Sequence, residues 1–249
     1  MFGLKPKLPI TEDERLWVDE GFRRLSRMLG SSRLQNAAVI LPTDEYFPSP
    51  YTPTEQGLET LFTQVCAYMQ VPRSRVILEI IPDSSNLIEM LPEFSHKSEG
   101  PAGLHFGSNS QDELPLVAVS KSLLKDPLSL VATLAHELGH VILLGGNHLS
   151  RDEDDMEPMT DLVTVFLGLG VFTANASRHF RQFQNDRRQG WSMQRLGYLP
   201  EVVFAYALAR FAFERREEKP AWTSHLSTNL KTWFNQSSVW LKKDMRTIE

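Results

Sequence analysis

One segment of the chain, residues 126–146, constrains the fold most, because it is apolar on nearly every side and yet contains ionisable side chains. Asp126 and Pro127 suit the N-cap and the first position of a helix, and two consecutive glycines suit its end. A helix that is apolar nearly all round is buried in a protein interior. Three ionisable residues lie within it: His136, Glu137 and His140. We therefore expect a core helix that carries a chemical function.

The spacing of these three residues points to a metal ion. Side chains four residues apart lie on one face of a helix, so His136 and His140 can bind the same zinc ion. Glu137 is next to the first histidine and can reach a metal-bound water as a general base. Desolvating charged groups without a partner is costly, and a cation would compensate all three. The alternative is a hydrogen-bonded histidine pair in the core with no metal.

The sequence His-Glu-Leu-Gly-His, with the helix from about Asp126 to Leu144, resembles the motif helix of the zincin superfamily of zinc metallopeptidases. In that superfamily the two histidines bind Zn²⁺ and the glutamate activates water. The resemblance implies a zincin-like fold and a hydrolase that cleaves peptide bonds in a peptide or protein substrate. It assigns zinc binding to His136 and His140 and the catalytic role to Glu137.

A catalytic zinc site needs a third protein ligand in addition to an open position. The metzincin pattern places a glycine and a histidine three and six residues after the second histidine. Here those positions are Leu143 and Gly146, and His148 comes two residues too late. The metzincin pattern therefore does not fit.

An acidic segment after the motif helix offers a better third ligand. Pro158 is restricted to the first turn of a helix, so we expect a helix that Asp155 caps. Glu157 and Asp161 lie four residues apart on it, where two carboxylates repel each other unless a cation or donor lies between them. This Glu-x-x-x-Asp pair is similar to the gluzincin pattern of thermolysin-like enzymes. The similarity implies that Glu157 binds zinc and that Asp161 accepts the proton on the far nitrogen of His136.

Two other readings of this acidic pair stay open. Asp161 can itself be the zinc ligand in place of Glu157. Alternatively, the acids only favour the positive end of the helix dipole, as acidic residues in a first helical turn commonly do.

The rest of the chain predicts an α+β protein: a small mixed sheet packed on the motif helix, and a mainly helical C-terminal part. Apolar periodicity predicts helices at about 12–29, 55–70, 202–217 and 226–241. Strands are expected at 37–41, 76–81 and 116–119, an irregular loop at 42–54, and turns with a hairpin within 92–113. The strand at 116–119 is a candidate for the sheet edge that pairs with substrate. We expect one domain over 1–249, with an α/β part at 1–115 and the motif helix and helical part at 116–249.

Composition excludes several other classes of protein. The formal net charge of −5 comes without a basic stripe, so nucleic-acid binding is not expected. Cys66 is the single cysteine, which excludes an internal disulfide and a thiolate zinc cluster, and apolar neighbours predict that it is buried. The longest apolar run, residues 162–174, is shorter than the roughly 20 residues of a membrane span. The N-terminus lacks the apolar core of a signal peptide, so we expect a cytoplasmic protein without a membrane partner.

Several functional questions are open at the level of the sequence. Four residues could donate a hydrogen bond to the oxyanion of a peptidase: His148, His179, Tyr198 and Tyr206. The alternative function is a non-catalytic or narrowly regulatory zincin-like module that acts on one protein partner, as in the ImmA/IrrE group, which this chain resembles in its motif and acidic helix. Hydrolysis of a non-peptide amide, the substrate's identity and the oligomeric state are likewise open.

Overall fold

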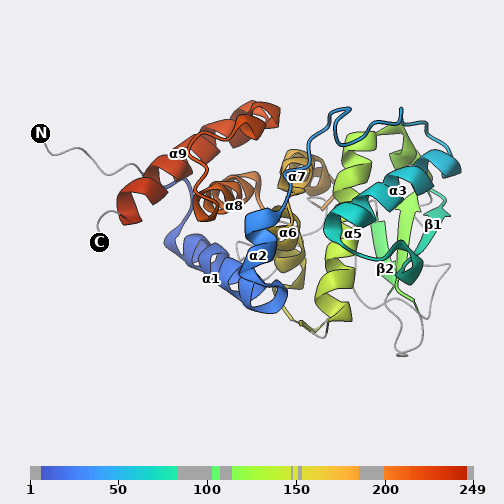
Figure 1. The fold of residues 1–249 in the computed structure, drawn as a ribbon, viewed down its shortest axis with the longest axis horizontal. Coiled ribbons are helices and arrows are strands. Elements are labelled where there is room, and N and C mark those ends of the chain that lie inside the picture. The colour runs from blue at the N-terminus through green and yellow to red at the C-terminus, as the bar shows by residue number, and fades with distance from the viewer. Residues whose placement is uncertain are drawn as a thin grey trace, which may run out of the picture. The chain divides into compact units, whose positions relative to one another are not determined.

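The computed structural model describes residues 7–83, 103–106, 114–146, 148–150, 153–184 and 199–245. The described chain is mostly helical with one small sheet, which confirms the expected α+β class (Figure 1). It forms two compact units, Met1–Leu41 with Asp152–Glu249, and Pro42–Arg151. The single domain over 1–249, with parts at 1–115 and 116–249, stays a prediction.

The unit Pro42–Arg151 contains the sheet and the motif helix. Its helices are α3 (Glu55–Met69) and α5 (Pro127–Gly145), and its strands are β1 (Ile77–Ile81), β2 (Gly103–Phe106) and β3 (Leu116–Ser120). Short 3₁₀ helices at Arg73–Arg75 and Lys121–Lys125 precede β1 and α5. α5 packs against α3, β2 and β3, so the small sheet lies on the motif helix as expected.

The sheet is mixed, in the order β1-β3-β2. β1 is parallel to β3, with Ile77 opposite Leu116, and β2 is antiparallel to it, with Gly103 opposite Val119. β3 is therefore the central strand, and the expectation that it forms a sheet edge is wrong. Both of its sides pair with strands that precede it in the chain, and such pairings carry no local sequence signal. The rest of the turn-rich segment 92–113 lies outside the described residues.

α5 begins and ends where the sequence predicts. The Asp126 carboxylate accepts a 3.2 Å hydrogen bond from the Ser129 backbone N–H, Pro127 is the first helical residue, and Gly146 follows the last turn. Among the described helices, α5 alone is long and apolar enough to span a membrane, but 67% of the apolar stretch is buried in the protein. Such burial is typical of a core helix.

The described elements of the unit of Met1–Leu41 and Asp152–Glu249 are all helices. It comprises α1 (Glu12–Leu29), α2 (Ser31–Asn36), α6 (Met156–Phe166), α7 (Gly170–Gln184), α8 (Glu201–Glu214), a 3₁₀ helix (Ala221–His225) and α9 (Thr228–Met245). Thr11 and Glu14 form the expected capping box at the start of α1, in which each side chain bonds the other residue's backbone N–H. α1 packs against α6 and α8, and α8 packs against α9.

The expected strand at 37–41 is not formed. Instead, the backbone N–H of Ile40 donates a 2.9 Å hydrogen bond to the carbonyl of Gly168, in the turn between α6 and α7. Gly168 has φ +90°, and a Cβ there would lie 2.0 Å from the Ala38 carbonyl oxygen, so only glycine permits this approach. Ile40 is buried, and burial is what its apolar neighbourhood indicated; a buried coil and a buried strand share that signal.

Candidate metal centre

The motif residues lie in the buried middle of α5. His136, Glu137 and His140 are each at most 7% exposed. The two imidazole ring centroids are 4.9 Å apart and the ring planes are nearly perpendicular, at 83°. This is the arrangement expected for side chains four residues apart that project from one helix face.

The structure brings Glu157 together with the two histidines. One ligand atom from each of His136, His140 and Glu157 lies within 4.8 Å of the other two, the only such cluster among the described residues. Around a tetrahedral zinc ion bound at about 2.1 Å, ligand atoms are separated by about 3.4 Å. The donor atoms thus need to approach one another by at most about 1.4 Å to hold a zinc ion. The triad is compatible with a metal site.

At the start of α6, two acidic neighbours of Glu157 are paired with α1. Asp155 occupies the N-cap position but makes no capping hydrogen bond through its side chain, contrary to expectation. Its carboxylate instead pairs with Arg24 of α1 at 3.4 Å, and Glu153 pairs with the same guanidinium at 2.7 Å. Pro158 sits in the first turn as expected. The acidic segment therefore contains two residues that pair with α1 and one carboxylate of the candidate metal site.

Asp161 is buried one turn after Glu157, and its carboxylate binds a backbone N–H group. Its Oδ2 accepts a 2.7 Å hydrogen bond from the backbone N–H of Leu199, just before α8. The contact between Asp161 and His136 that the gluzincin pattern implies stays a prediction. The backbone hydrogen bond was not visible as a local pattern, since Leu199 is 38 residues away.

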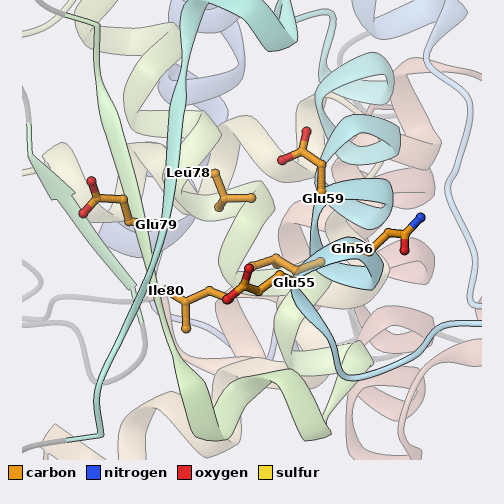
Figure 2. Close-up of a pocket in the computed structure, with 7 residues that line it drawn as sticks. Glu55, Gln56, Glu59, Leu78, Glu79 and Ile80 are labelled. Carbon is orange, nitrogen blue, oxygen red and sulfur yellow. The ribbon is translucent and has the colours of Figure 1, made fainter.

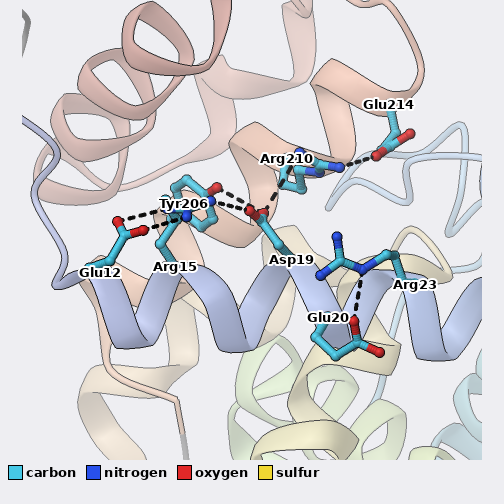
Figure 3. A network of polar contacts seen from close by, with 8 residues as sticks. All are labelled: Glu12, Arg15, Asp19, Glu20, Arg23, Tyr206, Arg210 and Glu214. Carbon is cyan, nitrogen blue, oxygen red and sulfur yellow. Dashed lines mark hydrogen bonds and ion pairs between the residues drawn. The ribbon is translucent and has the colours of Figure 1, made fainter. Parts of the chain in front are cut away.

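Of the four candidates for an oxyanion donor, the structure describes the side chains of two, Tyr206 and His148. The Tyr206 hydroxyl donates a 2.9 Å hydrogen bond to Oδ1 of Asp19 (Figure 3). A phenol has one O–H, so this donor is already in use. His148 is partly exposed and lies so close to Gly146 that a Cβ there would be 2.2 Å from its Nε2. The side chain of His179 and the whole of Tyr198 lie outside the described residues.

The acceptor of the Tyr206 hydroxyl belongs to a buried charge network between α1 and α8. Asp19 is paired with Arg15 at 2.7 Å and lies 3.7 Å from Arg210, which in turn binds Glu214 (Figure 3). Burial, together with the nearby Asp19 carboxylate, raises the pKa of Tyr206 well above its usual range. The phenol therefore stays protonated and acts as a structural donor.

A surface pocket of about 560 Å³ lies between α3 and β1, apart from the sequence-predicted residues (Figure 2). Its lining is Glu55, Gln56, Leu58, Glu59, Leu78, Glu79 and Ile80. Glu59 forms a two-pronged ion pair with Arg73, with N–O distances of 2.8 and 2.7 Å, which lowers the pKa of its carboxyl. None of the lining residues is a metal-site candidate.

Comparison with protein families, with curated proteins and with solved structures finds no match to this chain.

Proposed function

We propose that this protein is a zinc-dependent metallopeptidase of zincin-like architecture. His136, His140 and Glu157 are the zinc ligands in this proposal, and Glu137 is the catalytic base. The observation that carries it is the approach of the three ligand atoms to within 4.8 Å of one another.

The kind of donor favours a catalytic rather than a structural zinc site. Two imidazoles and one carboxylate are three protein ligands, which leave a position open, whereas structural zinc sites use four. Cys66 is the single cysteine, so a closed thiolate site is not available. A bound zinc ion supplies Lewis-acid polarisation of a carbonyl and acidifies water.

Glu137 is the proton carrier of the proposed reaction. It lies between the two histidines in sequence and is buried with them, 4% exposed. Its carboxylate takes a proton from the attacking water and delivers it to the departing amine nitrogen, so that it returns to its starting state. Asp161 is a positioning residue in this scheme, through the proton on the far nitrogen of His136.

The gluzincin-like pattern supports the choice of Glu157 over Asp161, since Glu157 is the member of the pair that joins the histidines in the cluster. The substrate class in this proposal is a peptide or protein, and the setting is the cytoplasm.

The deciding experiment measures zinc and peptide hydrolysis on the same preparations. We expect about one zinc per chain after purification without chelators, and cleavage of a mixed peptide pool detected by mass spectrometry. Glu137→Gln is expected to keep the zinc and lose cleavage, whereas Glu79→Gln on the exposed face of β1 changes neither. A metal-free wild type would rule out the proposal. Zinc without cleavage of any peptide would instead favour the regulatory module.

A further inference from the structure

The motif helix carries a buried threonine, Thr133, whose hydroxyl is not used within the part of the chain that the structure describes. Thr133 is 3% exposed, and its Oγ1 has no hydrogen-bond partner among the described residues. Burying a hydroxyl without a partner is unfavourable, so such groups are rare and call for an explanation.

Other buried helical threonines show what the ordinary arrangement is. In α6, Thr160 donates to the Met156 carbonyl at 2.8 Å and Thr164 to the Asp161 carbonyl at 2.7 Å. Such bonds to the preceding turn are the usual way for a helix to satisfy a buried threonine. Thr133 makes no bond of this kind. Its hydroxyl is therefore not satisfied by its own helix backbone.

Helical geometry places Thr133 on the face of α5 that carries the two histidines. A rotation of about 100° per residue puts Thr133 and His140 within about 20° of each other around α5. His136 and Glu137 flank that line, three and four residues after Thr133. Side chains on a helix lean toward its N-terminus, so the His136 imidazole leans over the turn that contains Thr133.

The surroundings of Thr133 on α5 favour an apolar side chain. The neighbours of Thr133 in the chain are apolar and equally buried, among them Leu130, Val131 and Leu134. Valine has the same shape as threonine and avoids the unfavourable burial of the hydroxyl. An unpaired hydroxyl on the ligand-bearing face is thus a feature that a bound molecule can use.

We propose that Thr133 is a ligand-binding residue of the metal centre, whose hydroxyl donates a hydrogen bond to a carbonyl-type oxygen of the bound peptide. This inference rests on the proposed function and extends it with a contact that the motif does not include. It also supplies a donor on the motif helix itself. The hydroxyl of Tyr206, on α8, already bonds Asp19.

The test uses acetohydroxamate, a metal chelator with a carbonyl-type oxygen, titrated calorimetrically into the zinc-loaded protein. Thr133→Val is expected to weaken binding about five- to tenfold, the effect of one lost hydrogen bond, while Thr133→Ser stays within about twofold of wild type. Zinc content is expected to be equal in all three. Thr173→Val is the matched control: Thr173 is also 3% exposed, but its hydroxyl already bonds Thr164 at 2.8 Å.

Unfolding of the metal-free proteins provides a second readout that needs no ligand. Thr133→Val is expected to be at least as stable as wild type, because it removes an unpaired buried hydroxyl, whereas Thr173→Val is less stable. A Thr133→Val protein as destabilised as Thr173→Val would mean an internal partner, and would overturn the inference. Unchanged hydroxamate affinity in zinc-loaded Thr133→Val would overturn it while leaving the metal centre intact. Wild-type protein that contains no zinc would contradict both the proposed metallopeptidase function and the role of Thr133.

Discussion

The hydroxyl of Tyr206 on α8 donates a 2.9 Å hydrogen bond to the carboxylate of Asp19 on α1, 187 residues away in the chain. Both side chains are buried, and the charge of Asp19 is balanced by Arg15 at 2.7 Å. A buried carboxylate is tolerated only when it is paired and hydrogen-bonded in this way. Tyr206, a candidate oxyanion donor from the sequence, is therefore part of the packing contact between α1 and α8.

Tyr206→Phe is accordingly expected to reduce stability and leave zinc content unchanged. Losing a hydrogen bond to a charged group costs about 1.5–3 kcal/mol, which lowers Tm by about 3–10 °C in a chain of this size. Tyr51→Phe is the control, because its hydroxyl donates to the neutral carbonyl of Leu124 at 2.9 Å, and it should cost about 0.5–1.5 kcal/mol. Thermal unfolding measures both. A Tyr206→Phe protein with wild-type Tm but no hydrolysis would return Tyr206 to the reaction centre.

The identity of the third ligand can be decided by two isosteric variants. Glu157→Gln is expected to lose most of the zinc, because the amide is a far weaker ligand than the carboxylate. Asp161→Asn should keep the metal with an affinity lowered about 10–100-fold, since Asp161 acts through His136. Its remaining carbonyl oxygen can still accept the Leu199 backbone N–H. Zinc titration against a competing chelator separates the two. The opposite order of affinities would make Asp161 the ligand.

Two glycines with nearly the same backbone conformation should respond differently to alanine. Gly30 and Gly168 have φ of +88° and +90°, so alanine is strained at both by about 1–3 kcal/mol. At Gly30 the nearest atom to a new Cβ is 3.7 Å away, whereas at Gly168 the Ala38 carbonyl oxygen is 2.0 Å away. Gly168→Ala should thus be clearly the more destabilising variant in chemical denaturation. An equal loss of stability in the two variants would mean that the segment 37–41 moves easily to make room for the new methyl group.

Cys66 is expected to be inert in the folded protein. It is 1% exposed, and burial raises the pKa of its thiol to about 12. In the unfolded chain the thiol ionises near pH 8.5, so its contribution to stability is complete below that pH. The contribution is lost as pH rises from about 8.5 toward the folded-state value. A thiol reagent at pH 8 should react only after unfolding, and Cys66→Ala should lose this part of the alkaline destabilisation. Rapid labelling of the native protein would contradict the assignment.

The features that the sequence predicted correctly are those whose signals span only one or two helical turns. Asp126 and Pro127 mark the start of α5 and Gly146 its end, and the capping box at Thr11 marks the start of α1. These signals work because a cap satisfies backbone groups only three or four residues away.

The incorrect predictions concern partners that are distant in the chain. The apolar run 37–41 was expected to be a strand, but its Ile40 bonds the turn at Gly168. β3 was expected at a sheet edge, but β1 and β2 pair with both its sides. Asp155 was expected to cap α6, but its carboxylate binds Arg24 of α1. In each case the local pattern indicated burial or charge correctly, and the partner was set by tertiary contacts.

By itself the sequence determined the chemistry on α5: a pair of imidazoles four residues apart with a carboxylate beside the first, on a helix too apolar to be exposed. That relation follows from the period of the α-helix and needs no further contact. Only the tertiary structure decided which acid joins the histidines, which tyrosine is engaged elsewhere, and that the hydroxyl of Thr133 has no hydrogen-bond partner in the described part of the chain. The reason is physical: helix periodicity fixes neighbours along one element, whereas the partner of a buried polar group is chosen by whatever the rest of the chain packs against it.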